Sequence, residues 1–370
     1  MQKSDSPSGL SLPLPVALRR QLKAAFLKEQ RCRLPSLPLA AVAFLAWELR
    51  RIFKRALVLV AANAVLQDDL LRSLAALGGQ EAAALLSFAA RSPRRHRAAD
   101  SSGERLQVLS QLQAGLARPL LVTCEQALAQ PVPAADLLRA RSLHLRLAEE
   151  YDPQALLSAL EALGYAPVPE VQFRSQVALR GGGLLDIWPS TARAPLRLEF
   201  FGTKIESMRL FDAADQRSFA RQTSVSIPPA DELILLRNQP QARSSLSAYL
   251  PAETIYFWLP PENEPAAAGR AAAAPEGSEA LPHTAQIQQE LAAQPAVWQC
   301  LAGADSAGTD FWRAAPMLEP GFQALDTLGA PPRRLFEPDI FAAHRQQWLA
   351  RLSAEVRRGG RVYVFFEAPG

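Results

Sequence analysis

The residues with the clearest chemical potential lie in one short run near the middle of the chain, Leu196–Phe201, which reads LRLEFF. Its alternation predicts a β-strand whose successive side chains point to opposite faces of a sheet. Arg197, Glu199 and Phe201 then share the face opposite to the core. Arginine and aromatic side chains supply most interface anchors, so this face is a candidate contact surface. An equally good interpretation is a sheet that the rest of the chain covers on both faces.

Residues for nucleotide chemistry are missing from the sequence. A phosphate-binding loop needs glycines and a lysine, yet the chain has no Gly-Lys pair, and the run at Cys32–Ala40, before an expected helix, has neither residue. No apolar strand runs into an Asp-Glu pair that could hold magnesium: Leu120–Glu125 ends in Cys-Glu, and Asp231-Glu232 follows Pro-Pro-Ala. The only glycine-rich loop, Gly181–Gly183, is typical of a turn. We therefore expect no ATP chemistry and no cofactor.

Metal and disulfide chemistry are not expected either. The three cysteines are odd in number and far apart in the sequence, which leaves neither a disulfide framework nor a Cys-x-x-Cys metal site available. The four histidines are scattered without partners at ligand spacing, so we interpret each as structural or as a surface residue. This cysteine usage predicts a reducing cytosol and hence a cytoplasmic location. The residues concerned are Cys32, Cys124, Cys300, His96, His144, His283 and His344.

The overall charge gives no strong nucleic-acid signature. The 370 residues carry a net charge of +4, and a DNA-binding patch would require clustered basic residues. One weak cluster occurs around SPRRHR, where we expect a solvated loop between helices, and weak non-specific DNA binding stays an alternative. No signal peptide is present at the start, and no apolar run is long enough to span a membrane. The cluster comprises Arg91, Arg94, Arg95, His96 and Arg97.

The candidate contact strand belongs to a predicted small antiparallel sheet. Three glycines separate its first two strands, and a short hairpin joins its last two. Upstream, Asp152 is a suitable N-cap for a helix that ends near Gly164 and backs the sheet. We predict that this small domain extends from Arg141 to Leu236. The predicted strands are Gln176–Arg180, Leu184–Trp188, Leu196–Phe201 and Lys204–Phe211.

On both sides of this domain, apolar strands alternate with amphipathic helices, which is typical of an α/β domain with a parallel sheet. The segment after the small domain returns to the same sheet, so we predict a discontinuous domain. Upstream we predict helices at Val16–Gln30, Ala40–Phe53, Val65–Leu77 and Glu104–Gly115, a strand at Ala56–Asn63, and at Pro119–Leu128 a buried strand that runs into a helix or turn. Downstream we predict strands at Thr254–Leu259, Ala296–Gly303 and Arg361–Glu367, and a helix at Phe341–Arg357.

These elements divide the chain into five segments. Residues 1–140 are the first part of the α/β domain, 141–236 are the small α+β domain, and 237–259 contain the return strand. Residues 260–282 are rich in proline and alanine and are predicted to be a loop or linker. Residues 283–370 are the second part of the α/β domain.

The motifs RGG, LLDIWP, PLRLEFFG, KIESMRLFD, QRS and SVSIPPADE, in this order, resemble the UvrB-like module of bacterial transcription-repair coupling factors (Mfd) and, less closely, UvrB. The resemblance spans nearly the whole chain and is sharpest at Leu143–Leu236. It implies a degenerate helicase-like (RecA-like) α/β domain, discontinuous in sequence. The inserted small α+β domain would be the UvrB interaction domain, which binds UvrA. The nucleotide motifs of that module are degenerate in the family, in agreement with the missing phosphate loop.

By the same resemblance, the residues that recognise UvrA are Arg180, Arg197 and Phe201. We expect Arg197 and Phe201 to lie exposed side by side, so that alanine at either position weakens binding and leaves thermal stability almost unchanged. The family usually has two small residues after the first arginine, whereas this chain has three, Gly181–Gly183. The extra glycine either forms a bulge or changes the direction of Arg180.

The resemblance implies a non-catalytic module that recruits UvrA in transcription-coupled nucleotide excision repair. Two alternatives stay open: an ATP-dependent UvrB-like helicase or DNA-binding repair subunit, and a truncated stand-alone UvrA-binding regulator. The sequence ends at Gly370, directly after the last predicted strand. We therefore expect this chain to lack the family's motor domains and the domain through which the family contacts RNA polymerase.

Overall fold

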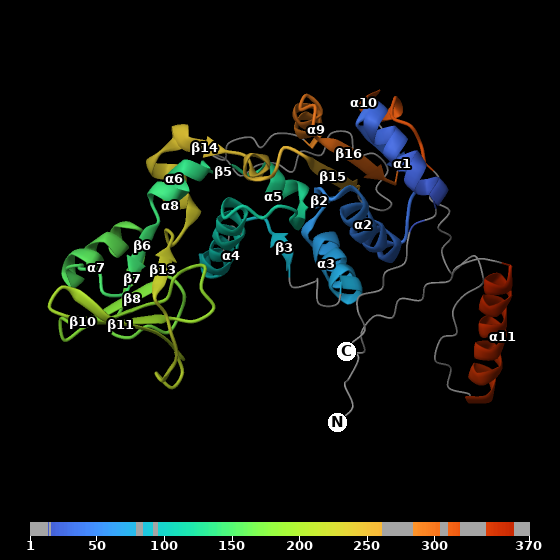
Figure 1. The fold of residues 1–370 in the computed structure, drawn as a ribbon. Coiled ribbons are helices and arrows are strands. Elements are labelled where there is room, and N and C mark those ends of the chain that lie inside the picture. The colour runs from blue at the N-terminus through green and yellow to red at the C-terminus, as the bar shows by residue number, and fades with distance from the viewer. Residues whose placement is uncertain are drawn as a thin grey trace.

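A computed structural model describes residue 14 and residues 16–78, 84–91, 95–260, 284–303, 310–318 and 338–358. Figure 1 shows two lobes, a larger α/β body and a smaller lobe built on an antiparallel sheet. The chain leaves the body after its first strands and helices, forms the small lobe, and then returns to the body. The small lobe is therefore an insertion, as the sequence predicts.

The body is built on a six-stranded sheet in which every pairing is parallel. Its strands are β1 (Arg31–Leu34), β2 (Ala56–Ala61), β3 (Leu85–Phe88), β4 (Leu120–Cys124), β15 (Thr254–Leu259) and β16 (Trp298–Ala302). Their order is β1-β16-β15-β2-β4-β3. The last two strands in sequence thus lie between the first two, which confirms the predicted return to the same sheet.

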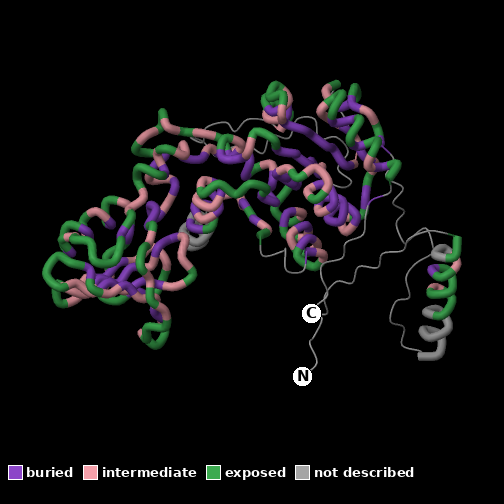
Figure 2. The backbone as a smooth tube through the Cα atoms, in the orientation of Figure 1, coloured by how far each residue is buried: buried purple, intermediate pink, exposed green. Residues whose placement is uncertain are grey.

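Helices cover both faces of this sheet. They are α1 (Val16–Glu29), α2 (Leu39–Phe53), α3 (Ala64–Gly78), α4 (Arg95–Gln113), α5 (Glu125–Ala129), α9 (Thr284–Ala292) and α10 (Asp310–Arg313). Alternation along β2 divides the core in two, because Leu57 and Leu59 pack with α1, α2 and α3 while Val58 and Val60 pack with α4, α5 and α9. Figure 2 shows the buried strands between these layers. The central strand β2, ALVLVA, is apolar at every position because both faces of the sheet are covered there.

The basic cluster does not form the predicted solvated loop. α4 begins at Arg95 rather than at Glu104, so Arg95, His96 and Arg97 lie in a helix. Arg91 is partly buried, donates a hydrogen bond to the carbonyl oxygen of Pro131 at 2.8 Å, and forms an ion pair with Glu232. Arg94 lies outside the described residues.

Two of the three cysteines meet in the parallel sheet. Cys32 of β1 is directly opposed to Cys300 of β16, and their Sγ atoms lie 3.4 Å apart without a disulfide bond. Burial raises the pKa of the Cys300 thiol. Separation along the sequence predicts no such pair, but pairing of β1 with β16 brings together residues 268 positions apart. Within the described ranges, no group of three or more side chains could hold a metal ion.

The small lobe contains a second six-stranded sheet. Its strands are β7 (Ala166–Pro167), β8 (Gln176–Arg180), β9 (Leu184–Ile187), β10 (Leu196–Phe201), β11 (Lys204–Phe211) and β12 (Ser218–Arg221), in the order β12-β11-β10-β9-β8-β7. All pairings are antiparallel except that of β7 with β8. The predicted strands are confirmed, with β9 ending one residue early.

A single helix, α7 (Pro153–Ala162), backs the inner face of this sheet. Its N-cap is Asp152, whose carboxylate accepts hydrogen bonds from the backbone N–H groups of Gln154 and Ala155 at 2.8 and 3.1 Å. The helix ends before Gly164, which adopts a φ of +88°. The positive φ favours glycine, and a Cβ at this position would lie 2.0 Å from the Cδ1 atom of Ile234, so that side chain would have to move.

A narrow neck joins the two lobes. It consists of β5 (Val132–Pro133), α6 (Ala135–Ala140), β6 (Leu143–Arg146), β13 (Ser224–Ile227), α8 (Glu232–Asn238), β14 (Arg243–Ser244) and the 3-10 turns at Pro240–Ala242 and Leu246–Tyr249. β6 pairs with β13, and β5 pairs with β14, both in antiparallel fashion. The segment that enters the small lobe and the segment that leaves it are therefore joined by strand pairing at two places.

A buried charge cluster fixes this neck to the body. Glu232, the first residue of α8, is fully buried and accepts a hydrogen bond from Arg105 of α4 at 2.5 Å. Arg91 lies 3.3 Å from the same carboxylate. Arg105 also donates to the carbonyl oxygen of Ala89 and lies over the ring of Phe88, 3.9 Å from its centroid. One carboxylate thus compensates two arginines at the junction of the lobes.

The C-terminal part of the chain contributes α11 (Pro338–Arg357), which includes the predicted helix at Phe341–Arg357. In Figure 1 it stands apart from both sheets. The predicted strand at Arg361–Glu367 and the predicted linker, apart from Pro260, lie outside the described residues. No helix in the described part of the chain is both long enough and apolar enough to cross a membrane.

Candidate functional site

The candidate site is the outer face of the small sheet, which points away from α7. Directly opposed residues of neighbouring strands share a face, and the register pairs Arg197 of β10 with Asp186 of β9 and with Arg209 of β11. Arg180 of β8 lies on the same face, because it is opposed to Leu184, two residues before Asp186. The predicted alternation is confirmed, since the leucines of β10 are buried on the inner face.

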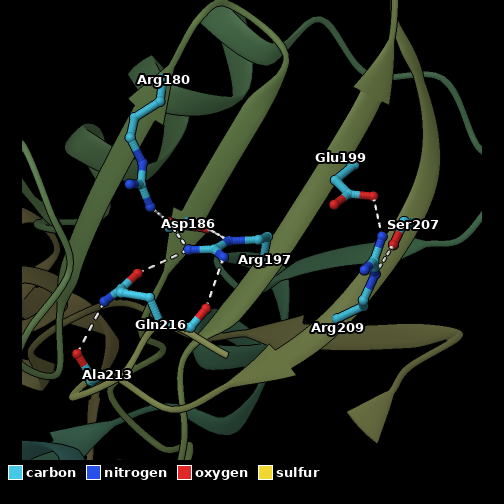
Figure 3. Close-up of polar contacts among 8 residues, drawn as sticks. All are labelled: Arg180, Asp186, Arg197, Glu199, Ser207, Arg209, Ala213 and Gln216. Carbon is cyan, nitrogen blue, oxygen red and sulfur yellow. Dashed lines mark hydrogen bonds and ion pairs between the residues drawn. The ribbon is translucent and has the colours of Figure 1, made fainter. Parts of the chain in front are cut away.

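Arg197 is held by contacts within the chain. Its Nε and Nη2 atoms donate to the two oxygens of Asp186 at 2.7 and 2.9 Å (Figure 3). Nη2 also donates to Oε1 of Gln216 at 2.9 Å, and Nη1 donates to the Gln216 carbonyl oxygen at 3.2 Å. The hydrogen bonds with Asp186 raise the pKa of Arg197, although burial opposes this shift. The side chain is only 15% exposed, so the expectation of an exposed guanidinium beside Phe201 is wrong.

Arg180 reaches the same carboxylate from the neighbouring side. Its Nη2 atom donates to Oδ2 of Asp186 (Figure 3), while the side chain stays 39% exposed. In the loop that follows, Gly181 and Gly182 adopt φ values of +55° and +73°, which favour glycine. The pairing of β8 with β9 continues without a shift up to Arg180 and Leu184. The extra glycine is therefore accommodated in the hairpin loop and not in a bulge.

Asp186 lies at the centre of the cluster. Its side chain is fully buried, and both arginines bond to it. A buried carboxylate is costly unless it is paired and hydrogen-bonded, and here both oxygens are satisfied. Two guanidiniums around one carboxylate leave a net charge of about +1 at the edge of the open surface.

One end of the outer face is covered by loops. Phe211 of β11 packs with Val171 and Ala178 in a small second core. The guanidinium carbon of Arg197 lies over the same ring, 4.4 Å from its centroid. Gln216, from the loop after β11, closes the remaining side of the arginine. For this end of the sheet, the interpretation of a face covered by the rest of the chain is correct.

The other end of the face is open. Phe201, the last residue of β10, is 76% exposed and precedes the hairpin turn at Gly202, whose φ is +61°. Beside it, Glu199 and Arg209 form an ion pair in which each side chain is more than a third exposed (Figure 3). A register shift between Glu199 and Phe200 interrupts the alternation next to the exposed ring. For this end, the interpretation of a contact surface fits.

Sequence reasoning identified Arg180, Arg197 and Phe201, but it missed the residues that hold the two arginines. The structure brings both arginines to Asp186, and it separates Phe201 from them at the end of the strand. One signal for Asp186 was present: a lone carboxylate interrupts the apolar run LLDIW. Gln216 is the first residue of the QRS motif, but because it lies in an irregular loop no local pattern indicated its contact with Arg197.

Comparison with known proteins points to the same part of the chain. Residues 143–233 match the family model described as the UvrB interaction domain. The chain is 33% identical over 141 residues to the transcription-repair-coupling factor of Bacillus subtilis (strain 168), an alignment that covers 38% of this chain and 12% of that protein. It is 36% identical over 169 residues to the corresponding protein of Mycobacterium bovis, covering 44% and 14% of the two chains. It is 32% identical over 133 residues to the transcription-repair-coupling factor of Escherichia coli (strain K12), an alignment that covers 36% of this chain and 11% of that protein.

The matched region therefore spans only about an eighth of the length of these relatives. The resemblance expected from the motifs is confirmed as a match to the UvrB interaction domain, within a region similar to the N-terminal part of transcription-repair coupling factors.

Proposed function

We propose that this chain is a non-catalytic module that recruits UvrA in transcription-coupled nucleotide excision repair. The observation that carries this proposal is the open outer face of the small sheet. There Arg180, the Asp186–Arg197 pair and the exposed ring of Phe201 lie inside the stretch that matches the UvrB interaction domain.

The chemistry of this face suits an acidic partner surface. Four arginines, Arg180, Arg197, Arg209 and Arg221, and Lys204, which is opposed to Phe201, lie on this face, where Asp186 and Glu199 supply carboxylates, so basic side chains are in excess. An arginine fork binds a carboxylate through two parallel hydrogen bonds, and an exposed phenyl ring gains free energy when it enters an apolar pocket. A partner that offers a carboxylate beside a shallow apolar pocket can use both features.

The first test replaces Phe201. We expect Phe201→Ala to weaken binding of the full chain to purified UvrA about thirtyfold, or about 2 kcal/mol, because an exposed aromatic ring is a typical interface anchor. Its urea unfolding midpoint should not change, since the ring is mostly exposed. Isothermal titration calorimetry measures the affinity, and circular dichroism follows unfolding.

A matched control is Phe219→Ala. Phe219 lies on the edge strand β12 of the same sheet and is 64% exposed. We expect this variant to bind UvrA like the wild type. Equal losses for both variants would point to a general hydrophobic effect, and full affinity of Phe201→Ala would show that this face is not the binding surface.

A second prediction concerns nucleotide, because an ATP-dependent helicase is the competing function. Between β1 and α2, where a phosphate loop would lie, Pro35 and Pro38 lack backbone N–H donors, and α2 has no side-chain cap. At the end of β4, Glu125 accepts a hydrogen bond from Thr284 at 2.7 Å, and burial raises its pKa. That carboxylate is engaged internally, which makes it a poor magnesium ligand.

We therefore expect millimolar ATP with magnesium to leave the melting temperature unchanged, and we expect no phosphate release with or without DNA. Differential scanning fluorimetry and a phosphate-release assay measure the two quantities. A shift of several degrees, or hydrolysis stimulated by DNA, would favour the helicase instead.

A further inference from the structure

The two arginines at Asp186 differ in what they can still offer to a partner. A guanidinium carries five N–H donors. Arg197 uses four of them on Asp186 and on the side chain and carbonyl of Gln216. A single N–H on Nη1 remains, which is insufficient for a fork-like contact with a carboxylate.

Arg180, in contrast, uses few of its N–H donors within the chain. It makes one hydrogen bond to Asp186 through Nη2, and its side chain is 39% exposed. Its Nε atom is buried and, among the described residues, has no hydrogen-bond partner. Three N–H donors on Nη1 and Nη2 remain for a ligand. The glycine loop that follows is itself open, because a Cβ at Gly181 or Gly182 would meet no atom of non-adjacent residues within 4 Å.

Asp186 connects the two side chains. Arg197 bonds to both of its oxygens, and Arg180 shares Oδ2 through a single hydrogen bond from Nη2, which leaves its other terminal N–H groups available. Without Arg197, the buried carboxylate would draw Arg180 into a full ion pair, since a buried charge requires compensation.

We infer that Arg180 supplies the bidentate contact to a carboxylate of the partner, and that Asp186 and Arg197 are positioning residues that orient it. The inference rests on the proposed function, because UvrA is the partner. It assigns different roles to two arginines that the sequence resemblance treats alike.

Matched lysine substitutions test this division. Arg180→Lys keeps the charge but loses the fork, so we expect at least a tenfold loss of affinity for purified UvrA. Arg197→Lys loses the fork to Asp186 and the stack on Phe211 but no direct contact with the partner, so we expect a lower unfolding midpoint and, per folded molecule, a smaller loss of affinity than for Arg180→Lys. Arg193→Lys, at an exposed position before β10, is the control and should bind like the wild type. A larger loss for Arg197→Lys than for Arg180→Lys would overturn the inference.

A double-mutant cycle tests the role of Asp186. Asp186→Asn should weaken binding about tenfold in the wild-type chain but less than about twofold when Arg180→Ala is already present, because Asp186 acts through Arg180. Equal losses in both backgrounds, measured per folded molecule, would show a merely structural role and overturn the inference. If Asp186→Asn does not fold, the lysine pair alone decides. A wild-type chain that does not bind UvrA would instead refute the proposed function itself.

Discussion

Glu232→Ala is expected to destabilise the protein by about 3–5 kcal/mol, the usual cost of removing one partner from a buried ion pair. Arg105 would lose its counter-charge at a position where its side chain is 1% exposed, and Arg91 would lose the same partner. Burial already lowers the pKa of Arg105, and the carboxylate of Glu232 is the main group that opposes this shift. Urea unfolding followed by circular dichroism measures the change.

An exposed ion pair provides the control for this prediction. Asp136 pairs with Arg139 on α6, and both side chains are mostly exposed. Asp136→Ala should leave the unfolding midpoint unchanged, because solvent screens such pairs. If Glu232→Ala were equally harmless, the cluster at the neck would not hold the two lobes together.

Arg197→Ala is expected to cost about 2–3 kcal/mol of folding free energy as well as affinity for UvrA. The fully buried Asp186 would lose the two hydrogen bonds from Arg197 and would have Arg180 as its remaining ion-pair partner, and the ring of Phe211 would lose the cation above it. This expectation reverses the sequence-based one, in which an exposed Arg197 contributes almost nothing to stability.

Arg193→Ala serves as the comparison, since Arg193 is exposed in the loop before β10. Its unfolding midpoint should match that of the wild type. Affinity must be measured at a temperature where every variant is folded, so that the two losses are separated. An unchanged midpoint for Arg197→Ala would mean that Arg180 alone compensates Asp186.

Sequence patterns predicted the helices and strands well because burial and helix capping act on the same residues that form each pattern. The largely apolar strands β2, β4 and β15 are buried at every position because both faces are covered, and the alternation of β10 reflects one buried face. Asp152 and Gly164 bound α7 as caps do, through backbone donors and a positive φ.

The incorrect predictions concern contacts between residues that are far apart in the sequence. Alternation assigns a side chain to a face, but it does not say what covers that face. Val171 packs beside Phe211 and Gln216 accepts a hydrogen bond from Arg197, and both residues come from irregular loops. Alternation along β10 did not predict that these loops cover Arg197. Likewise, the contact between Cys32 and Cys300 depends on strand order in the sheet, which no local pattern records.

The strand order also has a consequence for the synthesis of the chain on the ribosome. β1 is the edge strand of the body, and its neighbour β16 is made 268 residues later. At about 5–20 residues per second, β1 waits roughly 13–54 s for that neighbour, whereas every strand of the small lobe emerges before β15. The lobe that carries the recognition face is therefore expected to fold first, while the nascent body still lacks two of its inner strands.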